Sequence, residues 1–253
     1  DSGRNAHIAK IRGHRPERIV RVESHRRPPP PLEGAKPPAG NVILYADSYY
    51  SGTSATVEPQ RSYKHYQLIV ETARRMPGCQ FLIKFHPLRD RKREEQCFIG
   101  MDEDELYVRT RYIRELRPPS NVKLVPPEES MMDWIPKASV LLNSNSTAGL
   151  EAFVLGVPVI FLYQPNTELG FPLLWDYEAC IVAEEPLNLE GEINRLQTDG
   201  AHATRHIHNQ RRYVDEFYWS SGEQSLIEGI QSVLKMEEKA SHAASTGMSE
   251  AGP

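Results

Sequence analysis

The feature that most constrains the fold is a regular alternation of short apolar runs with amphipathic segments, which begins near position 41. Runs typical of buried strands lie at 41–47, 80–86, 121–125, 139–143 and 157–162. Between them, segments such as 63–76, 130–138 and 146–156 carry apolar residues at helical spacing. Near-continuous apolar strands separated by helices are typical of a parallel sheet covered on both faces. The sequence therefore predicts an α/β fold, a Rossmann-like parallel sheet from about Asn41 to Val182 with helices on both faces.

Differences in composition divide the chain into three regions. Residues 1–40 are rich in proline and basic residues, which is typical of a stiff linker, whereas residues 41–236 carry the strand and helix patterns. Within the second region, we interpret the charged segment 90–119, with its weak helical pattern, as an excursion from the sheet. Further helices are predicted at 188–197, 208–219 and 222–236. Residues 237–253 are mostly Ala, Ser, Gly and acidic residues, which predicts a disordered tail.

Composition and charge exclude several classes of function. The 253 residues are 39% hydrophobic and 25% charged, with a formal charge of −4, as in soluble globular proteins. This charge gives no reason to expect a nucleic-acid partner, and no apolar run approaches the ~20 residues of a membrane span. Cys79, Cys97 and Cys180 are isolated and odd in number. They predict neither a metal site nor a disulfide framework, which suits a reducing cytoplasm.

Polar residues follow three of the predicted strands at the point where each strand ends. Asp47 ends the first run, His86 ends the second, and a polar turn from Asn143 to Thr147 ends the fourth. Because the carboxyl ends of parallel strands meet at one edge of a sheet, these residues are expected to face one ligand. Lys84 points to the same side of its strand as His86 because side chains alternate with a period of two.

The polar turn leads into the helix predicted at 146–156. The first amides of a helix lack partners within it, and with the positive end of the helix dipole and nearby hydroxyls they suit a phosphate. Gly149 allows a ligand to approach closely, and Glu151, one turn into the helix, could accept hydrogen bonds from ribose hydroxyls. Ordinary capping by Ser146 or Thr147 explains the same residues. The turn by itself therefore leaves phosphate binding and capping open.

His86 favours the phosphate alternative. A histidine at a strand end, fixed by the following Pro87, can donate a hydrogen bond to a phosphoryl oxygen or protonate a leaving group. His202 and His206 have the spacing of metal ligands on a helix, but no carboxylate or thiol pattern accompanies them, so no metal is expected. The motifs of dinucleotide oxidoreductases, P-loop ATPases and α/β-hydrolases do not occur in the sequence.

These residues carry a resemblance to a known family. "LIKFHP" at 82–87, followed by the segment from "VKLV" to "VPVIFL" at 122–162, resembles the C-terminal half of a GT-B glycosyltransferase. It is most similar to enzymes of bacterial surface and capsular polysaccharide synthesis: Kdo transferases, sialyltransferases with a His-Pro motif, and CDP-glycerol glycerophosphotransferases. UDP-N-acetylglucosamine 2-epimerase shares the pattern more distantly. The resemblance spans about residues 11 to 235, and residues 13–24 resemble the segment that closes the N-terminal domain of such enzymes.

The resemblance implies a role for each matched residue. The His-Pro histidine and the hydroxyl-rich turn would contact the donor's phosphate, the helix carboxylate would suit the ribose, and the loop after the third strand would hold the base through backbone groups. The predicted donor-binding residues are Lys84, His86, Pro126, Pro127, Glu128, Ser144, Asn145, Ser146, Thr147, Gly149 and Glu151. His86 is also predicted to be catalytic, as is Asp47, the strand-end carboxylate placed to act as general base.

The predicted function is therefore the donor-binding part of an inverting, metal-independent glycosyltransferase of surface polysaccharide synthesis. A CMP-sugar such as CMP-Kdo is the favoured donor, although "NSNSTAG" at 143–149 departs from the double-serine form of many CMP-sugar enzymes. The partners would be the nucleotide-sugar and a carbohydrate or glycolipid acceptor, without a cofactor. A cytoplasmic location is expected, with peripheral association at the inner face of the membrane left open. The alternatives are a polyol-phosphate transferase of the CDP-glycerol or CDP-ribitol type and a non-catalytic nucleotide- or sugar-binding partner domain.

Overall fold

The computed structural model describes residues 40–47, 58–85, 104–126, 128–144, 146–162 and 174–218. The chain divides into two units, one of residues 29–211 and one of residues 1–28 with 212–253. The described part of the second unit is 212–218, which holds the end of one helix and the π-helix Val214–Tyr218. The predictions for the linker in 1–39, for the helix at 222–236 and for the tail at 237–253 lie outside the described residues. The sheet and its helices belong to the first unit, apart from the end of that one helix.

Six parallel strands form one sheet in the order β3-β2-β1-β4-β5-β6. The strands are β1 (Val42–Ala46), β2 (Gln80–Lys84), β3 (Val122–Leu124), β4 (Val140–Asn143), β5 (Val159–Leu162) and β6 (Ile181–Ala183). All residues of β4 and β5 are buried, which is why their sequences read as continuous apolar runs. The predicted Rossmann-like parallel sheet is confirmed.

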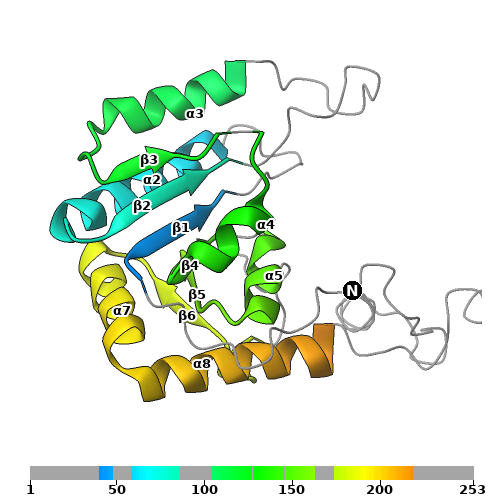
Figure 1. Ribbon diagram of the computed structural model, residues 1–253. Coiled ribbons are helices and arrows are strands. Elements are labelled where there is room, and N and C mark those ends of the chain that lie inside the picture. The colour runs from blue at the N-terminus through cyan, green and yellow to red at the C-terminus, as the bar shows by residue number, and fades with distance from the viewer. Residues whose placement is uncertain are drawn as a thin grey trace, which may run out of the picture. The chain divides into compact units, whose positions relative to one another are not determined.

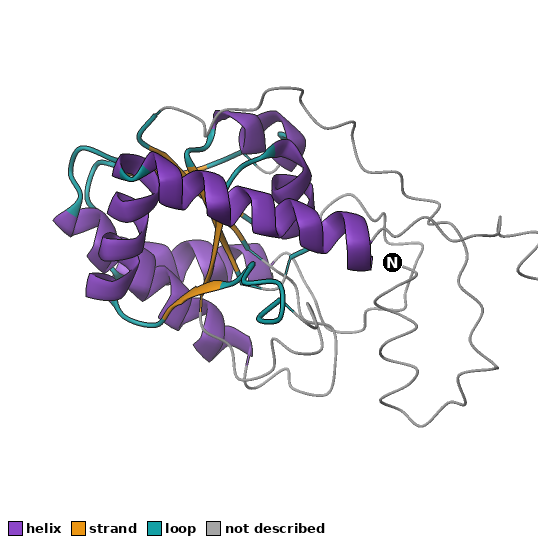
Figure 2. Ribbon diagram, turned by 90° about the horizontal axis from the view of Figure 1, so that it is seen from below, coloured by secondary structure: helices purple, strands orange, loops and turns teal. Residues whose placement is uncertain are grey.

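Helices lie on both sides of this sheet (Figures 1 and 2). They are α2 (Glu58–Arg75), α3 (Asp104–Glu115), α4 (Met131–Trp134) with the 3₁₀ turn Ile135–Lys137, α5 (Ala148–Leu155), α7 (Pro186–Thr198) and α8 (Gly200–Tyr213). Ser130 caps α4, because its hydroxyl accepts from the amide of Met132. Gly156 ends α5 in the left-handed region at φ 72°, where a side chain would be strained.

The two faces of the sheet pack against different helices. Alternate residues of the central strands, such as Ile43 and Tyr45 of β1, share a core cluster with side chains of α2, α3 and α7. We call this side the α2 face. The residues between them point to the other side, where Phe161 of β5 makes an edge-to-face contact with Phe153 of α5 at 6.3 Å between ring centroids. We call that side the α5 face.

Three elements differ from the sequence interpretation, and one of them is α8, which begins at Gly200 although the helix was predicted to begin at position 208. β6 was not predicted, because its three residues are too few to show a period and two of them are only half-buried. The charged segment interpreted as an excursion contains α3, which packs against α2 through the ring contact of Tyr63 with Tyr112. Residues 104–115 therefore form part of the crossover from β2 to β3, the connection that parallel strands require.

Candidate functional site

The strand order places a topological switch point between β1 and β4. The chain runs from β1 to β2 and β3 on one side of β1, then returns to form β4 on the other side. In open α/β sheets, ligands bind beyond the carboxyl ends of the strands at such a point. Ala46 pairs with Asn143 at the ends of these two strands, and Asp47 follows directly after β1. Two of the polar strand ends singled out from the sequence thus flank the switch point.

On the α5 face, Lys84 and Asn143 lie on either side of Ala46. Ala46 pairs with Lys84 of β2 and with Asn143 of β4, so the three form one row across the strand ends. With strands ~4.8 Å apart, the outer two Cα atoms are separated by about 10 Å. Both polar side chains are buried, Lys84 at 2% exposure and Asn143 at 0%. A buried lysine at a strand end is costly, and such residues are typical of functional sites.

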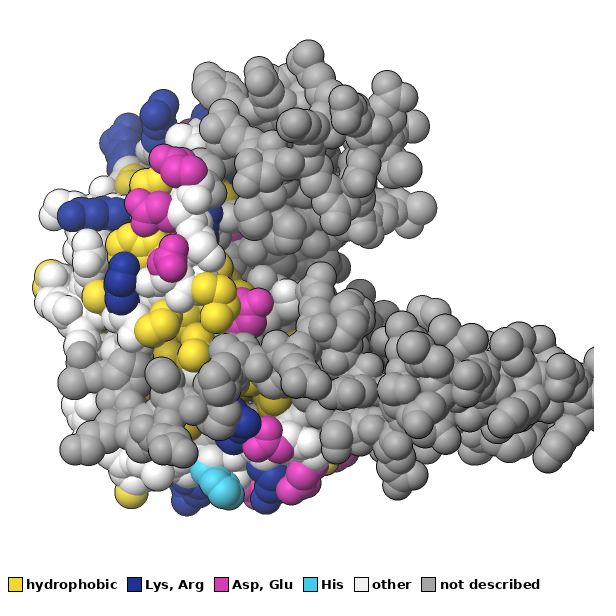
Figure 3. All heavy atoms as spheres, turned by 45° about the vertical axis from the view of Figure 1, so that its right-hand side comes forward, with side chains coloured by type: hydrophobic (Ala, Val, Ile, Leu, Met, Phe, Trp, Pro, Cys, Tyr) yellow, Lys and Arg dark blue, Asp and Glu magenta, His cyan; other side chains and the backbone are white. Residues whose placement is uncertain are grey.

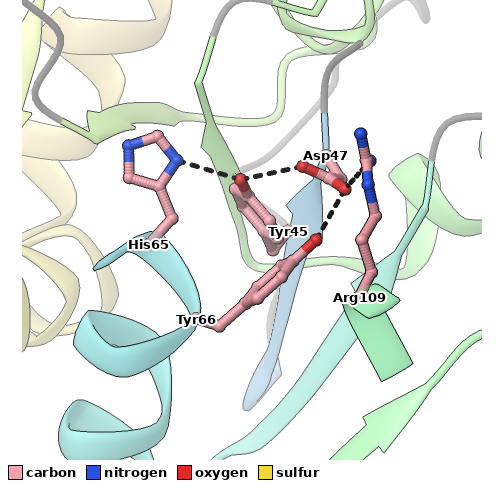
Figure 4. Close-up of polar contacts among 5 residues, drawn as sticks. All are labelled: Tyr45, Asp47, His65, Tyr66 and Arg109. Carbon is pink, nitrogen blue, oxygen red and sulfur yellow. Dashed lines mark hydrogen bonds and ion pairs between the residues drawn. The ribbon is translucent and has the colours of Figure 1, made fainter. Parts of the chain in front are cut away.

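On the α2 face, Asp47 is the centre of a buried polar network (Figure 4). Its Oδ2 accepts hydrogen bonds from the Tyr66 hydroxyl at 2.8 Å and from Nη1 of Arg109, with which it forms an ion pair. Its Oδ1 accepts from the Tyr45 hydroxyl at 3.2 Å. The Asp47 amide also donates to the Lys84 carbonyl at 3.0 Å, which continues the β1–β2 pairing past the end of the strand.

The network extends through Tyr45 to His65 of α2. Nδ1 of His65 lies 3.2 Å from the Tyr45 oxygen, and both residues are buried. The aromatic rings support this arrangement, since Tyr45 makes edge-to-face contacts with Tyr66 and with His65 at 6.2 Å between centroids. Strand β1 and helices α2 and α3 thus all contribute polar groups to one end of the sheet.

The turn after β4 is held by its own hydrogen bonds. Nδ2 of Asn143 donates to the Ser146 carbonyl, and the Ser146 amide donates to Oδ1 of Asn143, both at 3.0 Å. The Ser146 hydroxyl accepts from the Ala148 amide at 3.3 Å, whereas Thr147, the residue before α5, makes no capping bond with its side chain. Ser144 is buried. Part of the predicted capping therefore occurs, but through Ser146 rather than Thr147.

The next amides of α5 also have partners. The Gly149 amide donates to the Ser146 carbonyl at 3.1 Å, and the Leu150 amide donates to the Thr147 carbonyl at 3.0 Å. A bound phosphate would have to share these donors. Glu151 lies in the first turn of α5 and is half-buried. These contacts leave the predicted binding roles of the turn and of Glu151 as predictions.

The loop predicted to hold the base follows β3. Pro126 and Glu128 are exposed. Next to them, Nε1 of Trp134 donates to the Glu129 carboxylate at 2.5 Å, and the ammonium of Lys137 lies 4.4 Å from the centroid of the Trp134 ring. His86, Pro127 and Asn145 lie outside the described residues, so their predicted roles stay predictions.

Sequence reasoning missed Tyr66, His65 and Arg109. For Tyr66 a signal existed, because it stands three and seven residues before Ile69 and Ala73 and so on the buried side of α2. Arg109 gave no local signal. It lies 62 residues from Asp47 in the chain, and only the tertiary fold brings the two together.

On α8, His206 bonds the backbone of β5 and a neighbouring glutamine. Nε2 of His206 lies 3.1 Å from the Val159 carbonyl and 2.7 Å from Nε2 of Gln210, and the amide of Gln210 also bonds the backbone of Val159 and Ala179. Burial lowers the pKa of His206 to about 4. Across the described segments, no group of three or more metal-binding side chains occurs.

Neither of the two described cysteines has the surroundings of a reactive thiolate. Burial raises the pKa of the Cys180 thiol to about 12 and also raises that of Cys79, so neither is suited to act as a thiolate nucleophile. Figure 3 shows hydrophobic side chains gathered near the middle of the coloured atoms of one face, with basic and acidic side chains around them. None of the helices in the described part of the chain is long and apolar enough to cross a membrane.

No family model and no curated protein matches the chain. Among solved structures, a mutant O-GlcNAc transferase of Thermobaculum terrenum has a TM-score of 0.51 at 17% identity, covering 86% of this chain and 40% of its own. A mutant of S. aureus TarM, in complex with fondaparinux, α-GlcNAc-glycerol and UDP, has a TM-score of 0.50 at 12% identity, covering 84% and 38%. HepE of Anabaena, in complex with UDP-glucose, has a TM-score of 0.48 at 10% identity, covering 79% and 49%.

At such identities the first two similarities establish the fold alone. The described residues have a fold that also occurs as part of known glycosyltransferases. The chain spans less than half the length of each of these three proteins.

Proposed function

We propose that this chain binds the nucleotide-sugar donor of an inverting glycosyltransferase of the GT-B type. In this proposal the enzyme acts in bacterial surface polysaccharide synthesis, in the cytoplasm or at the inner face of the membrane. It transfers sugar from a CMP-sugar such as CMP-Kdo to a carbohydrate or glycolipid acceptor. It needs neither a metal nor another cofactor, so a chelator should leave nucleotide binding unchanged.

The observation that supports this proposal most directly is where the buried polar side chains gather. Five of them lie at the carboxyl ends of β1, β2 and β4 or pack against those ends: Asp47, Lys84, Arg109, Asn143 and Ser144. Several other buried polar residues of the described part satisfy nearby backbone groups. Thr72 donates to the Leu68 carbonyl, for example, and Ser139 donates to the Val42 carbonyl. Of these residues, Lys84 supplies positive charge outside the Asp47–Arg109 pair, and a cation beside a switch point suits an anionic ligand.

The proposed chemistry is displacement at the anomeric carbon of the donor. The bond from that carbon to the phosphate oxygen breaks, a bond to the acceptor oxygen forms, and the acceptor proton goes to a base. Negative charge grows on the departing nucleotide, where His86 and the amides of α5 would stabilise it. The sequence alone suggests Asp47 as the base, but its contacts with Tyr66 and Arg109 favour a positioning role.

Nucleotide binding by the chain tests the proposal. A ligand that binds the folded state raises its stability by mass action, about 2.7 kcal/mol at a hundredfold excess over Kd. For a chain of this size that corresponds to a rise in Tm of roughly 5–10 °C. We expect CMP to raise Tm more than UMP, UDP or GDP, in a concentration-dependent way.

The same titration separates the alternatives. A larger shift with CDP than with CMP would favour a transferase of the CDP-glycerol type, which is attacked at phosphorus rather than at carbon. A larger shift with UDP than with the cytidine nucleotides would replace the proposed donor. No shift with any pyrimidine nucleotide at millimolar concentration would reject donor binding by this chain.

A further inference from the structure

We infer that Asp47 is a positioning residue, which with Arg109 and Tyr66 ties helices α2 and α3 to the carboxyl end of β1. The inference rests on the proposed function in one respect, since the edge that this tie holds is the proposed donor edge. It differs from the role of general base that the sequence suggests for Asp47.

The burial and contacts of the Asp47 carboxylate carry the inference. Its side chain is only 2% exposed, and both of its oxygens accept hydrogen bonds from the protein. A general base must reach the acceptor hydroxyl with a lone pair that is open to it. A carboxylate enclosed by a guanidinium and two phenols instead suits a fixed anchor, because these donors replace water around the charge.

The positions of Arg109 and Tyr66 in the chain indicate which parts of the fold the Asp47 contacts would hold in place. Arg109 lies in α3, whose first residue, Asp104, ends the connection from β2 that contains the predicted phosphate ligand His86. Tyr66 lies in α2, whose first residue, Glu58, ends the connection from β1. Both connections leave the sheet at its carboxyl edge. One carboxylate thus contacts both helices that follow the connections leaving β1 and β2.

Because Asp47 and Arg109 form an ion pair, the effects of substituting them should not be additive. Removing one partner of a buried pair leaves the other charge unpaired, which is far costlier than removing both. Asp47→Asn and Arg109→Met should each weaken CMP or UDP binding by roughly tenfold, and the double variant should be no worse than either alone. Arg109→Lys keeps the charge and should restore part of the affinity.

Controls separate positioning from general loss of stability. Arg111→Met changes an exposed arginine of the same helix, and Leu189→Ala removes most of a buried core side chain of α7, which does not contribute to the Asp47 network. Both should bind nucleotide like the wild type wherever they remain folded. If Asp47→Asn does not fold, Tyr66→Phe removes a single hydroxyl from the same carboxylate, and Tyr63→Phe on the same helix is its control.

The measurements are nucleotide titration of the whole chain and amide hydrogen exchange of residues 104–115. Faster exchange of α3 in Arg109→Met than in Arg111→Met, together with the coupled loss of affinity, supports the tie. Unchanged nucleotide affinity in Asp47→Asn, or independent effects of the two substitutions, would overturn it. If the wild type binds no nucleotide, the proposed function fails. Amide hydrogen exchange then tests by itself whether Asp47 holds α3 in place. Equal exchange rates of α3 in Arg109→Met and Arg111→Met would reject that role.

Discussion

A carboxylate buried as deeply as that of Asp47 is tolerated only where donors replace its water shell. The donors here come from three elements, because Tyr45 belongs to β1, Tyr66 to α2 and Arg109 to α3. At the scale of single residues, the candidate site is therefore a set of side chains that fix one another. The effect of a substitution in this set should therefore depend on which buried charge or hydrogen-bonding group it leaves without a partner.

The contacts of Tyr45 predict the tautomer of His65. The Tyr45 hydroxyl has one proton and lies 3.2 Å from both Asp47 and His65. Because the carboxylate paired with Arg109 only accepts, the proton points to Asp47, and the phenol oxygen must accept from His65. We expect neutral His65 to carry its proton on Nδ1, as measured by ¹⁵N NMR of the ring. A spectrum typical of the Nε2–H form would contradict the hydrogen-bond order, and Tyr45→Phe should release the preference.

The residue on which the proposed chemistry most depends is His86, whose role is a sequence prediction. If it stabilises charge that grows on the departing phosphate, its loss should affect the transition state more than the bound ground state. His86→Ala should then keep most nucleotide affinity and lose transfer by ~10²–10³-fold, the effect of removing one such hydrogen bond. The rate is measured in a protein that also carries an acceptor-binding half. Transfer at near wild-type rate would reject this mechanism, whatever the fold.

The sequence predicted part of the candidate site and could not predict the rest. Asp47 and the turn after β4 were placed at one edge because each ends an apolar strand, and the strand order confirms that placement. The sequence could not reveal which side chain would pair with Asp47. Arg109 stands in a charged segment with a weak helical pattern, and its use becomes evident only when α3 packs beside α2.

At the scale of elements, the sequence predicts a strand correctly where both faces are buried, because nearly every consecutive residue is then apolar. β4 and β5 are fully buried and were recognised as strands, and Gly156 was recognised as the end of α5. Short or half-exposed elements gave no such pattern. β6 has three residues, two of them half-buried, so neither a period of two nor an apolar run could identify it.

The contact of α8 with β5 predicts how stability depends on pH. The pKa of His206 is about 4 because of burial, below the ~6.5 of an exposed histidine. Between these pH values the unfolded chain binds a proton that the folded chain does not. The free energy of unfolding therefore rises with pH in this window. It should be about 2 kcal/mol smaller at pH 5 than at pH 7.

Urea unfolding at the two pH values measures this dependence. His206→Gln removes the more strongly shifted histidine and should reduce this dependence, whereas His208→Gln, an exposed position on the same helix, should leave it unchanged. An equal pH dependence in the wild type and His206→Gln would show that another group is responsible.

At the scale of the whole molecule, the sheet order and the arrangement of helices decide where a ligand can bind, and the residues there decide which ligand. The fold is shared with parts of much longer glycosyltransferases, of which the chain spans less than half. At the switch point of this chain, Asp47 and Arg109 are buried on the α2 face and Lys84 and Asn143 on the α5 face.

This arrangement predicts that the phosphate, rather than the base, supplies most of the binding energy. The Lys84 ammonium and the helix amides gain little from a neutral nucleoside, whereas hydrogen bonds to a charged group are roughly twice as strong as neutral ones. CMP should therefore raise Tm at concentrations where cytidine has no effect, and inorganic phosphate should compete with CMP. Higher salt should weaken the CMP shift, as expected for a contact between charges. Equal shifts with cytidine and CMP would mean that the nucleotide is held by its base, and the phosphate site inferred for this edge would then be wrong although nucleotide binding itself stood.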